Sequence, residues 1–584
     1  PVTLWGEYSG DAAFSGGGNN VRITITTPAG VSAIVPSVSA NPVFPISDSQ
    51  GLVWTETVRL REAAGVASIL TGFSIDGQAQ KLSDYFPSVA IPPNTTVSSV
   101  TMNFRNLATY PATRRFGFTG VDVTGQTWTR EITALFLAPP TSTAGITPTL
   151  APLTMTQDPD ADPSCQWSQQ LFLDETRGSS SSFTLLNLGA VSFSSQISTI
   201  FGTTRLQAWG GLRGTLCWSG VTPGTSSTVQ VGMSNGLSQT LQVNFAGPVA
   251  SPVKIGVSSS NVSLSAADAQ TTAKTSVAVS LSDKTQGWTA SVFPANAATA
   301  WLKVGPRSGP GAGTLNISAS GDGFEPGVYR ATIVVQSANA VPAAVNIPVM
   351  FVYGPSSGIS IKGAGSAATF LPTASPGMLF SIFGTQLANS TKQASATPLP
   401  FSLDGVSAKV NGLDAPILYV SPDQLNIQIP YEAGAGPAVL GVNNNGQIAG
   451  FQIRIAPAAP GILADSSNNL VPSSSLKAGG TSTLYLTGDG DIASGMLTGF
   501  APSTTTPVTS LPKSRLPVLV TVGGVPAFVQ FYGIPVGLVG VSQLNFTVPA
   551  SVPPGVQPVV VTVGGISSPP VNVTVQAASG AGPN

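Results

Sequence analysis

The sequence contains no histidine among its 584 residues. Histidine is the commonest general base in enzymes and a common zinc ligand, so its absence excludes the usual Ser-His triads and most zinc sites. Only catalysis by carboxylates alone remains among the usual acid–base mechanisms. We therefore expect a protein that is not an enzyme and needs no cofactor, with a carboxylate enzyme as an open alternative.

Charged residues are also scarce, at 8% of the chain, and 24 basic residues nearly balance 25 acidic ones. About a quarter of residues are charged in an ordinary soluble domain. A nearly uncharged surface opposes contact only weakly, which favours self-association into a homopolymer or surface layer. Nucleic acid is excluded as a partner, because phosphate binding needs a basic stripe and the sequence has only the pair Arg114 and Arg115.

Long apolar runs are missing as well, although the mean hydropathy is +0.26. A membrane-spanning helix needs roughly 18 apolar residues in succession, and even the stretch 341–353 is interrupted by two prolines and an asparagine. We expect no transmembrane segment. The chain begins at Pro1 with no basic and apolar leader, which is typical of a processed, exported product, so we expect a secreted or cell-surface protein.

Only two cysteines are present, Cys165 and Cys217. An even count in an exported β protein favours a disulfide between them. Two buried free thiols are the alternative. A metal pair is disfavoured, because the sequence has neither histidine nor a CxxC spacing.

The sequence is rich in residue types that favour strands and turns. Short runs rich in Val, Ile, Thr and Ser are broken by 64 glycines and 49 prolines, which predicts an all-β fold. The chain is too long for one core and should form several tandem β-sandwiches. Proline-rich connections such as 138–153 favour extended links and hence an elongated array.

Two C-terminal segments repeat each other. SPDQLNIQIP (421–430) returns as VSQLNFTVP (541–549), and the strands around both copies also correspond. Alternation predicts a strand with Leu425, Ile427 and Ile429 in a core, while Asn426 bonds neighbouring groups and sets the register.

At these residues the sequence resembles the Solibacter-type C-terminal domain of secreted acidobacterial proteins. The resemblance is carried by NGLDAPILYVSPDQLNIQIPYEAGAGPAVLGVNNNG and an ending near APAAPGIL, is close over 359–464 and looser over 465–577. It implies Ig-like or TIG-like β-sandwiches on an exported protein. It supplies no catalytic residue.

A fainter repeat lies in the N-terminal half, where 53–65 corresponds to 166–178. Trp54 and Trp167 hold equivalent places and are predicted to lie in the core. The equivalent Glu62 and Glu175 fall in separate modules, so we interpret them as turn ends and not as a catalytic carboxylate pair. A short helix is expected after each copy, in KLSDYF (81–86) and QISTIF (196–201).

Six modules and a tail follow from these repeats. The segment 254–354 resembles BACON-type and related Ig-like bacterial modules, and we expect Trp288 and Trp301 in its core. Residues 1–28 look like the closing hairpin of an incomplete upstream module. This segment either completes, or is completed by, strands of another chain, or marks a trimmed precursor, and pairing within the chain is left open. The predicted division is 1–28 (closing hairpin), 29–140, 141–250, 251–354, 355–464, 465–577 and a tail, 578–584.

Most motifs with catalytic spacing have a simpler structural interpretation. GMSNG (232–236) matches GxSxG but is followed by a strand pattern, so it predicts a hairpin turn. The pair Ser474 and Lys477 forms an SxxK in a Pro/Ser loop without a KTG partner, and GPGAG (309–313) lacks the lysine of a phosphate loop.

Two candidate binding sites remain open. Asp158, Asp160 and Asp162 have a calcium-like spacing, which suggests either a calcium-stiffened joint or a solvated linker. Trp128 and Trp209, which lie near predicted turns, are candidates for contact with a glycan or a subunit.

The leading functional hypothesis is therefore a non-enzymatic extracellular structural protein. It would serve as a surface stalk, a matrix component or a self-assembling fibre subunit, held by β-strand pairing and apolar contacts. The alternative is a glycan-binding adhesin or a carbohydrate-binding accessory protein.

Overall fold

The chain folds almost entirely into β-strands, as the sequence predicts. The computed structural model describes residues 2–4, 23–25, 31–38, 43, 45–48, 51–62, 64–107, 112–136, 144–268, 270–395, 397–493 and 495–576, which divide into two compact units, Pro1–Pro139 and Pro140–Asn584. The two expected helices are present as single short turns, α1 (Leu82–Tyr85) and α2 (Ile197–Phe201). In the described part of the chain no helix has the length and apolar character that crossing a membrane requires.

The first unit holds one β-sandwich, here module 1 (31–136), with its core between the sheets. Its strands are β3 (Ile34–Val38), β4 (Pro45–Asp48), β5 (Gly51–Glu56), β6 (Val58–Glu62), β7 (Ser68–Ile75), β8 (Gln78–Gln80), β9 (Ala90–Ile91), β10 (Thr96–Ser98), β11 (Met102–Phe104), β12 (Ala112–Asp122) and β13 (Thr127–Phe136). The strand β12 alternates because Phe116 and Phe118 face the core while their neighbours face outward.

The expected N-terminal hairpin is present within the described residues. Strand β1 (Val2–Leu4) pairs antiparallel with β2 (Ile23–Ile25) of the same chain. The rest of the predicted segment 1–28 lies outside the described residues, and completion by another chain stays a prediction.

The second unit holds four sandwiches, each with its own core of alternating apolar residues. In module 2 (144–246) the strands are β14 (Ile146–Ala151), β15 (Thr154–Thr156), β16 (Trp167–Glu175), β17 (Ser181–Leu188), β18 (Val191–Ser192), β19 (Arg205–Leu206), β20 (Gly211–Trp218), β21 (Ser226–Met233) and β22 (Ser238–Ala246). In module 3 (253–353) they are β23 (Ile255–Val257), β24 (Val262–Ala266), β25 (Thr272–Leu281), β26 (Gly287–Phe293), β27 (Leu302–Gly305), β28 (Ser308–Pro310), β29 (Ala312–Ser320), β30 (Gly327–Ser337) and β31 (Ala344–Tyr353).

Modules 4 and 5 contain the repeated C-terminal phrase. In module 4 (359–455) the strands are β32 (Ser360–Ser366), β33 (Thr373–Ala374), β34 (Leu379–Thr385), β35 (Lys392–Gln393), β36 (Ser402–Leu403), β37 (Val406–Val410), β38 (Leu413–Ala415), β39 (Ile417–Val420), β40 (Gln424–Gln428), β41 (Gly436–Asn444) and β42 (Gln447–Ile455). In module 5 (458–576) they are β43 (Gly461–Ile462), β44 (Ser475–Lys477), β45 (Thr481–Thr487), β46 (Val518–Val522), β47 (Val525–Gly533), β48 (Ser542–Thr547), β49 (Gly555–Val563), β50 (Ile566–Ser567) and β51 (Val571–Gln576).

The boundary between the last two modules lies earlier than the sequence suggested. Strand β43 pairs with β45, and Ala458 and Ile462 pack in the core of module 5. Residues 458–464 therefore belong to module 5, although the repeat placed them in the preceding one.

The residues predicted for the cores are buried. Trp54, Trp167, Trp288 and Trp301 are all at most 2% exposed. Each indole lies between the sheets of its own module, where a large flat side chain buries the most apolar surface.

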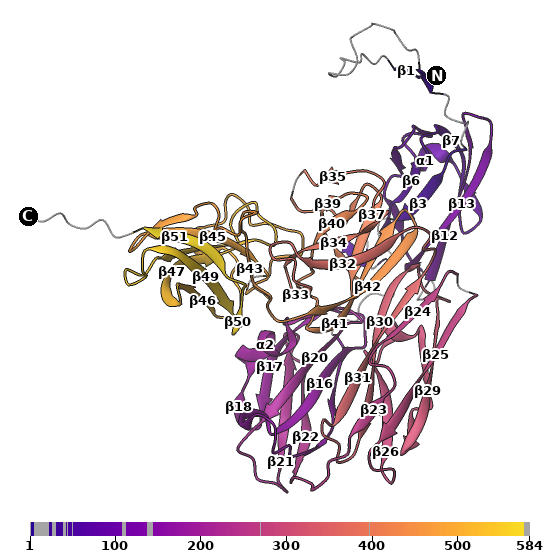
Figure 1. Cartoon of the computed structure of the whole chain (residues 1–584). Coiled ribbons are helices and arrows are strands. Elements are labelled where there is room, and N and C mark those ends of the chain that lie inside the picture. Colours follow the sequence, from indigo (N-terminus) through magenta and orange to yellow (C-terminus); the bar gives the residue numbers. More distant parts are fainter. Residues whose placement is uncertain are drawn as a thin grey trace, which may run out of the picture. The chain divides into compact units, whose positions relative to one another are not determined.

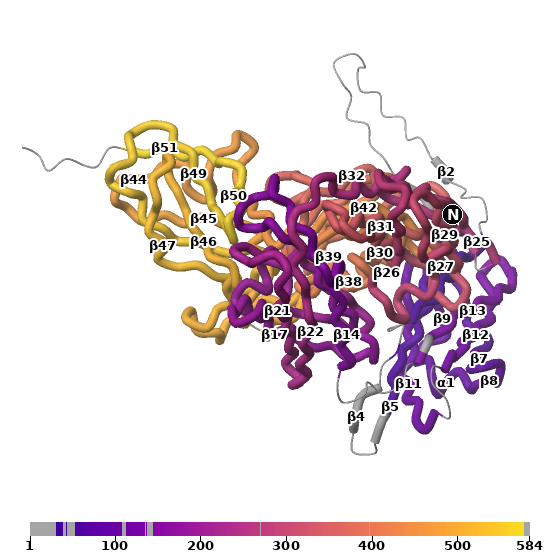
Figure 2. Tube along the Cα trace, turned by 90° about the horizontal axis from the view of Figure 1, so that it is seen from below, coloured from indigo at the N-terminus to yellow at the C-terminus, as the bar shows by residue number. Residues whose placement is uncertain are grey.

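Within the second unit, modules that are far apart in the sequence also touch. Ser198 of module 2 donates a hydrogen bond to Asp491 of module 5. Strand β30 of module 3 lies beside β41 of module 4, and β31 lies beside β42 (Figure 1 and Figure 2). Polar and apolar contacts thus join these modules.

Candidate functional site

The motifs with catalytic spacing have structural roles. GMSNG (232–236) forms the turn between β21 and β22, where Gly236 has φ of 85°, so the hairpin prediction is confirmed. GPGAG (309–313) spans the end of β28 and the start of β29, and the predicted turn is only a bend at Gly311, where the chain passes from one sheet to the other. Lys477 lies at the end of the short strand β44 with an exposed side chain.

Glu175 is a fully buried carboxylate that holds a loop of module 2 together. Its two oxygens accept hydrogen bonds from four backbone amides, those of Gly145 (3.1 Å), Arg177 (2.9 Å), Gly178 (2.7 Å) and Trp209 (2.8 Å). A buried amide without a partner is costly, and one carboxylate here satisfies four of them. The predicted role as a turn end is confirmed.

Glu62 does the same in module 1. Its carboxylate accepts from the amides of Ala33, Ala64, Gly65 and Asn94 at 2.7 to 3.2 Å. Burial raises the pKa of Glu62, but the four backbone hydrogen bonds outweigh burial and leave the pKa below its usual value. The repeat therefore preserves a carboxylate clamp, not a pair of catalytic acids.

The three aspartates with calcium-like spacing do not converge. Asp158 accepts from the backbone amide of Asp160, while Asp162 caps a short 3-10 helix (Pro163–Cys165) by accepting from Ser164. Across the residues that the structure describes, no group of three or more His, Cys, Asp or Glu side chains could hold a metal ion. The calcium joint is therefore not supported, because Asp158 and Asp162 bond their own local backbone and the three side chains form no common site.

Trp128 is a core residue and offers no ring face to a glycan. It is 7% exposed and donates a hydrogen bond from Nε1 to the Ser68 hydroxyl at 2.5 Å. Trp209 is half-buried, with φ of 55°, and its indole lies against Gly178. Its carbonyl accepts from Asn296 of module 3 at 3.0 Å, so Trp209 belongs to the joint between modules 2 and 3.

The predicted disulfide is present. Cys165 and Cys217 are bonded, with their Cα atoms 4.5 Å apart, and link the start of β16 to β20. The disulfide ties a connecting segment to an existing sheet of module 2.

The repeated phrase keeps the same contacts in both copies. Leu425, Ile427 and Ile429 are buried, as predicted. The Gln424 amide donates to Asn426 at 2.9 Å, as Gln543 does to Asn545. In the second copy Asn545 also accepts from Thr483 on the neighbouring strand, which confirms that this asparagine helps to set the register.

A buried ionic cluster joins modules 2, 4 and 5, and the sequence did not predict it. Asp491 of module 5 has no exposed surface and accepts from the Ser198 hydroxyl, and from the amide and hydroxyl of Thr204, at 3.0 to 3.1 Å. Arg515 of its own module lies 3.2 Å from the same carboxylate. A charge from one module is thus neutralised by groups of another.

Arg205 extends this cluster into module 4. Its guanidinium donates to Glu432 at 2.9 Å and to the carbonyl of Met496 at 3.0 Å, and it lies 5.1 Å from the ring centroid of Tyr431. Glu432 in turn accepts from Thr498 of module 5 at 2.8 Å. These residues, Arg205, Glu432, Thr498 and Asp491, are called the ionic junction below.

Apolar contacts close the other joints of the second unit. Phe172 of module 2 packs on Phe293 of module 3, with ring centroids 4.9 Å apart. Val328 of module 3 and Val439 of module 4 belong to one buried cluster. The modules are therefore joined by small cores of their own.

Asp174 lies beside the joint between modules 2 and 3 and is expected to make stability depend on pH. Burial raises its pKa from 3.8 to about 6, against a hydrogen bond from the amide of Ala295 and the charge of Arg330. Because the folded protein holds this proton more tightly, the contribution of Asp174 to stability is complete below pH 4 and is lost as pH rises towards 6, by about 3 kcal/mol. Denaturation of Asp174→Asn should show a gain over the native protein above pH 6 that vanishes below pH 4; a constant difference would contradict this.

The sequence matches no protein-family model and no curated protein. Several solved structures share the tandem β-domain organisation at low similarity. A Bacteroides ovatus mixed-linkage glucan utilization locus SGBP-B, in complex with a mixed-linkage heptasaccharide, is 13% identical, with TM-score 0.25, over 56% of this chain and 71% of that one. The human desmocollin-1 ectodomain is 8% identical, with TM-score 0.15, over 88% of this chain and 94% of that one.

Protocadherin gamma B2 extracellular domains 3–6 are 10% identical, with TM-score 0.15, over 74% of this chain and all of that one. At these TM-scores the likenesses carry no argument about function. The resemblance to the Solibacter-type C-terminal domain stays a prediction.

Proposed function

We propose that this chain is a non-enzymatic extracellular structural protein, a surface stalk, matrix component or fibre subunit. The observation that carries the proposal is the ionic junction, where the fully buried Asp491 of module 5 is bonded by side chains of module 2. Bending this joint would remove the hydrogen bonds of Ser198 and Thr204 from a buried carboxylate and leave it with Arg515 alone, which is unfavourable. The contacts of the ionic junction therefore hold modules 2, 4 and 5 in one arrangement, as a structural role requires.

The disulfide supports an oxidising compartment outside the cytoplasm. Disulfides persist in secreted and cell-surface proteins and are rare where thiols are kept reduced. Cys165–Cys217 connects β20 to the segment before β16, so it reinforces module 2.

Self-association is the second part of the proposal, and module 5 offers a surface for it. The side chains of Leu519 on β46 and Phe528 on the neighbouring strand β47 are 65% and 73% exposed. A chain with net charge −1 opposes contact between copies only weakly. We therefore infer that a second copy of this chain binds this surface.

Sedimentation velocity over a range of concentrations tests the assembly. We expect the native chain to associate as its concentration rises and Phe528→Lys to remain a monomer, because a charge on the patch must be desolvated on contact. Val508→Lys, at a residue 65% exposed in a loop of the same module, is the matched control and should associate like the native chain. A native chain that stays monomeric at high concentration would contradict self-association.

Glycan binding has no support from the tryptophans considered for it. Trp128 is buried, and the backbone of Trp209 bonds the side chains of Glu175 in module 2 and Asn296 in module 3. We therefore propose no second function.

A further inference from the structure

Three arginines from three different modules meet beside the joint of modules 2, 3 and 4. Arg213 lies on β20, Arg330 on β30 and Arg454 on β42. Arg213 packs so closely on Gly436 that a Cβ there would be 2.9 Å from its Nη2. The next residue, Pro437, pairs in register with Arg454.

The charges of the three side chains act on one another. Burial, and then the charge of Arg213, lowers the pKa of Arg330 to about 10. Burial, and then the charge of Arg454, lowers the pKa of Arg213 to about 10. Arg213 and Arg330 are therefore protonated at neutral pH and repel each other.

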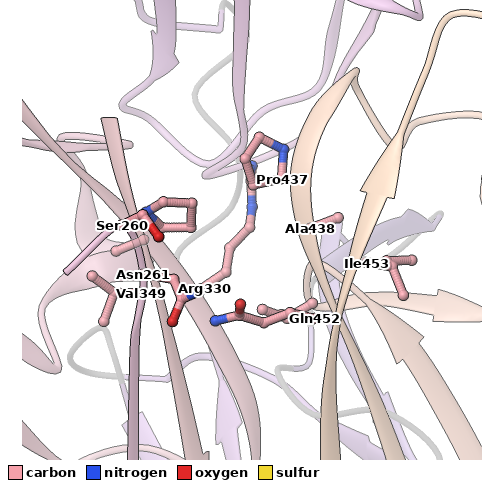
Figure 3. A pocket seen from close by; sticks show the side chains of 11 residues that line it. Ser260, Asn261, Arg330, Val349, Pro437, Ala438, Gln452 and Ile453 are labelled. Atoms are coloured by element: carbon pink, nitrogen blue, oxygen red, sulfur yellow. The ribbon is translucent and has the colours of Figure 1, made fainter. Parts of the chain in front are cut away.

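A cavity of about 150 Å³ lies at this cluster, between β30 and β31 on one side and β41 and β42 on the other. Figure 3 shows the Arg330 side chain reaching towards Pro437 between the two walls. The amide groups of Asn261 and Gln452 line the same cavity from opposite walls. Hydrogen-bond donors of two modules thus converge on one space.

The guanidinium groups of the cluster lack direct partners. Among the described residues, none of the three makes a hydrogen bond or an ion pair, and Nη1 of Arg213 is buried without a partner. One acid, Asp174, acts on Arg330 through its charge, and burial raises the pKa of this acid to about 6. A single acid offsets only part of the positive charge, so the fold retains Arg213 and Arg330 at a cost in stability.

We propose that this arginine cluster binds an oxyanion, a carboxylate, sulfate or phosphate group, in the cavity that Arg330 lines. Guanidinium groups bind such anions through paired hydrogen bonds, and the cavity is large enough for one of them. A bound anion would contact Arg330 directly and reduce its repulsion with the neighbouring Arg213, and residues of modules 3 and 4 would enclose it. The proposal does not depend on the proposed structural role.

Isothermal titration calorimetry of the full chain tests the site. Sodium sulfate, sodium phosphate and sodium glucuronate are titrated at an ionic strength matched with sodium chloride, and neutral glucose serves as a blank. We expect one saturable site for at least one oxyanion and none for glucose. A preference for glucuronate would indicate an acidic saccharide as the source, whereas a preference for sulfate or phosphate would indicate the free inorganic anion.

Variants locate the binding. Arg330→Gln should raise the dissociation constant at least tenfold. Arg330→Lys should recover part of the lost affinity, because it restores the charge without the planar guanidinium group. Arg307→Gln, at an exposed arginine of the same module, should bind like the native chain. If Arg330→Gln does not fold, as judged by circular dichroism, the exposed Arg454→Gln carries the same test.

Two results would overturn the proposal. One is the absence of saturable binding for all three oxyanions. The other is binding that Arg330→Gln and Arg454→Gln leave unchanged, since the anion would then occupy another part of the chain.

Discussion

Replacing Glu175 with alanine is expected to destabilise module 2 by on the order of 5 kcal/mol, because four buried amides lose their acceptor and each unsatisfied amide costs about 1 to 3 kcal/mol. The amides of Gly145, Gly178 and Trp209 come from three separate segments that this carboxylate holds together. Hydrogen exchange with mass spectrometry should show faster exchange of the peptides that contain them, while modules 4 and 5 keep their protection.

Two further variants make this result specific. Glu175→Gln keeps the shape but turns an NH₂ group towards amide donors, so it should lose most of the same protection. Asp160→Asn removes an exposed carboxylate of the same module and should change stability by less than about 0.5 kcal/mol. If Glu175→Gln exchanges like the native chain, the buried charge is not what holds the loop.

The equivalent clamp in module 1 has a pH signature. The backbone hydrogen bonds keep the pKa of Glu62 below its unfolded value near 4.5. Its contribution is therefore complete above about pH 4.5 and is lost as pH falls through the folded pKa. Glu62→Gln should flatten the acid side of the stability profile of module 1.

Replacing Asp491 with alanine is expected to cost about 3 to 5 kcal/mol, the usual effect of breaking a buried ion pair by removing one partner. Ser198, Thr204 and Arg515 would all lose their acceptor. Because these partners belong to two modules, the variant should also uncouple them. Scanning calorimetry should then show modules 2 and 5 unfolding in separate transitions that overlap in the native chain.

A surface ion pair is the matched control for this experiment. Asp414 lies 2.6 Å from Lys409, and both side chains are about half exposed. Asp414→Ala should therefore lower the free energy of unfolding by no more than about 1 kcal/mol, and the transitions of modules 2 and 5 should still overlap. Equal effects of the two variants would mean that the ionic junction does not couple the modules.

The strands and cores were predictable because their signal is local. In β40, apolar residues alternate with Gln424 and Asn426, and a strand places alternate side chains on opposite faces. The equivalent positions of Trp54 and Trp167 likewise predicted two related cores. Cys165 and Cys217 predicted their own pairing because the chain contains no third cysteine.

The functional junctions were not predictable in this way. Asp491 lies in the segment GDGD (488–491). Two acids so close together are unusual in a chain with 8% charged residues, and this pattern is the one local signal of a functional position here. That signal does not name Ser198 or Arg205 as partners. Trp128 misled the prediction, because its nearness to a turn suggested exposure while the sheet folds its indole inward over Gly120.

The sequence by itself determined that this protein is a series of β-sandwiches without histidine chemistry, since residue type and short-range alternation decide which backbone forms and which faces are buried. Only the tertiary structure decided that Asp491 lies beside Arg205 of another module and that Arg213 and Arg454 gather around Arg330, which lines a cavity. The physical reason is that electrostatic and packing energies depend on distances between residues far apart in the chain, which no local pattern encodes.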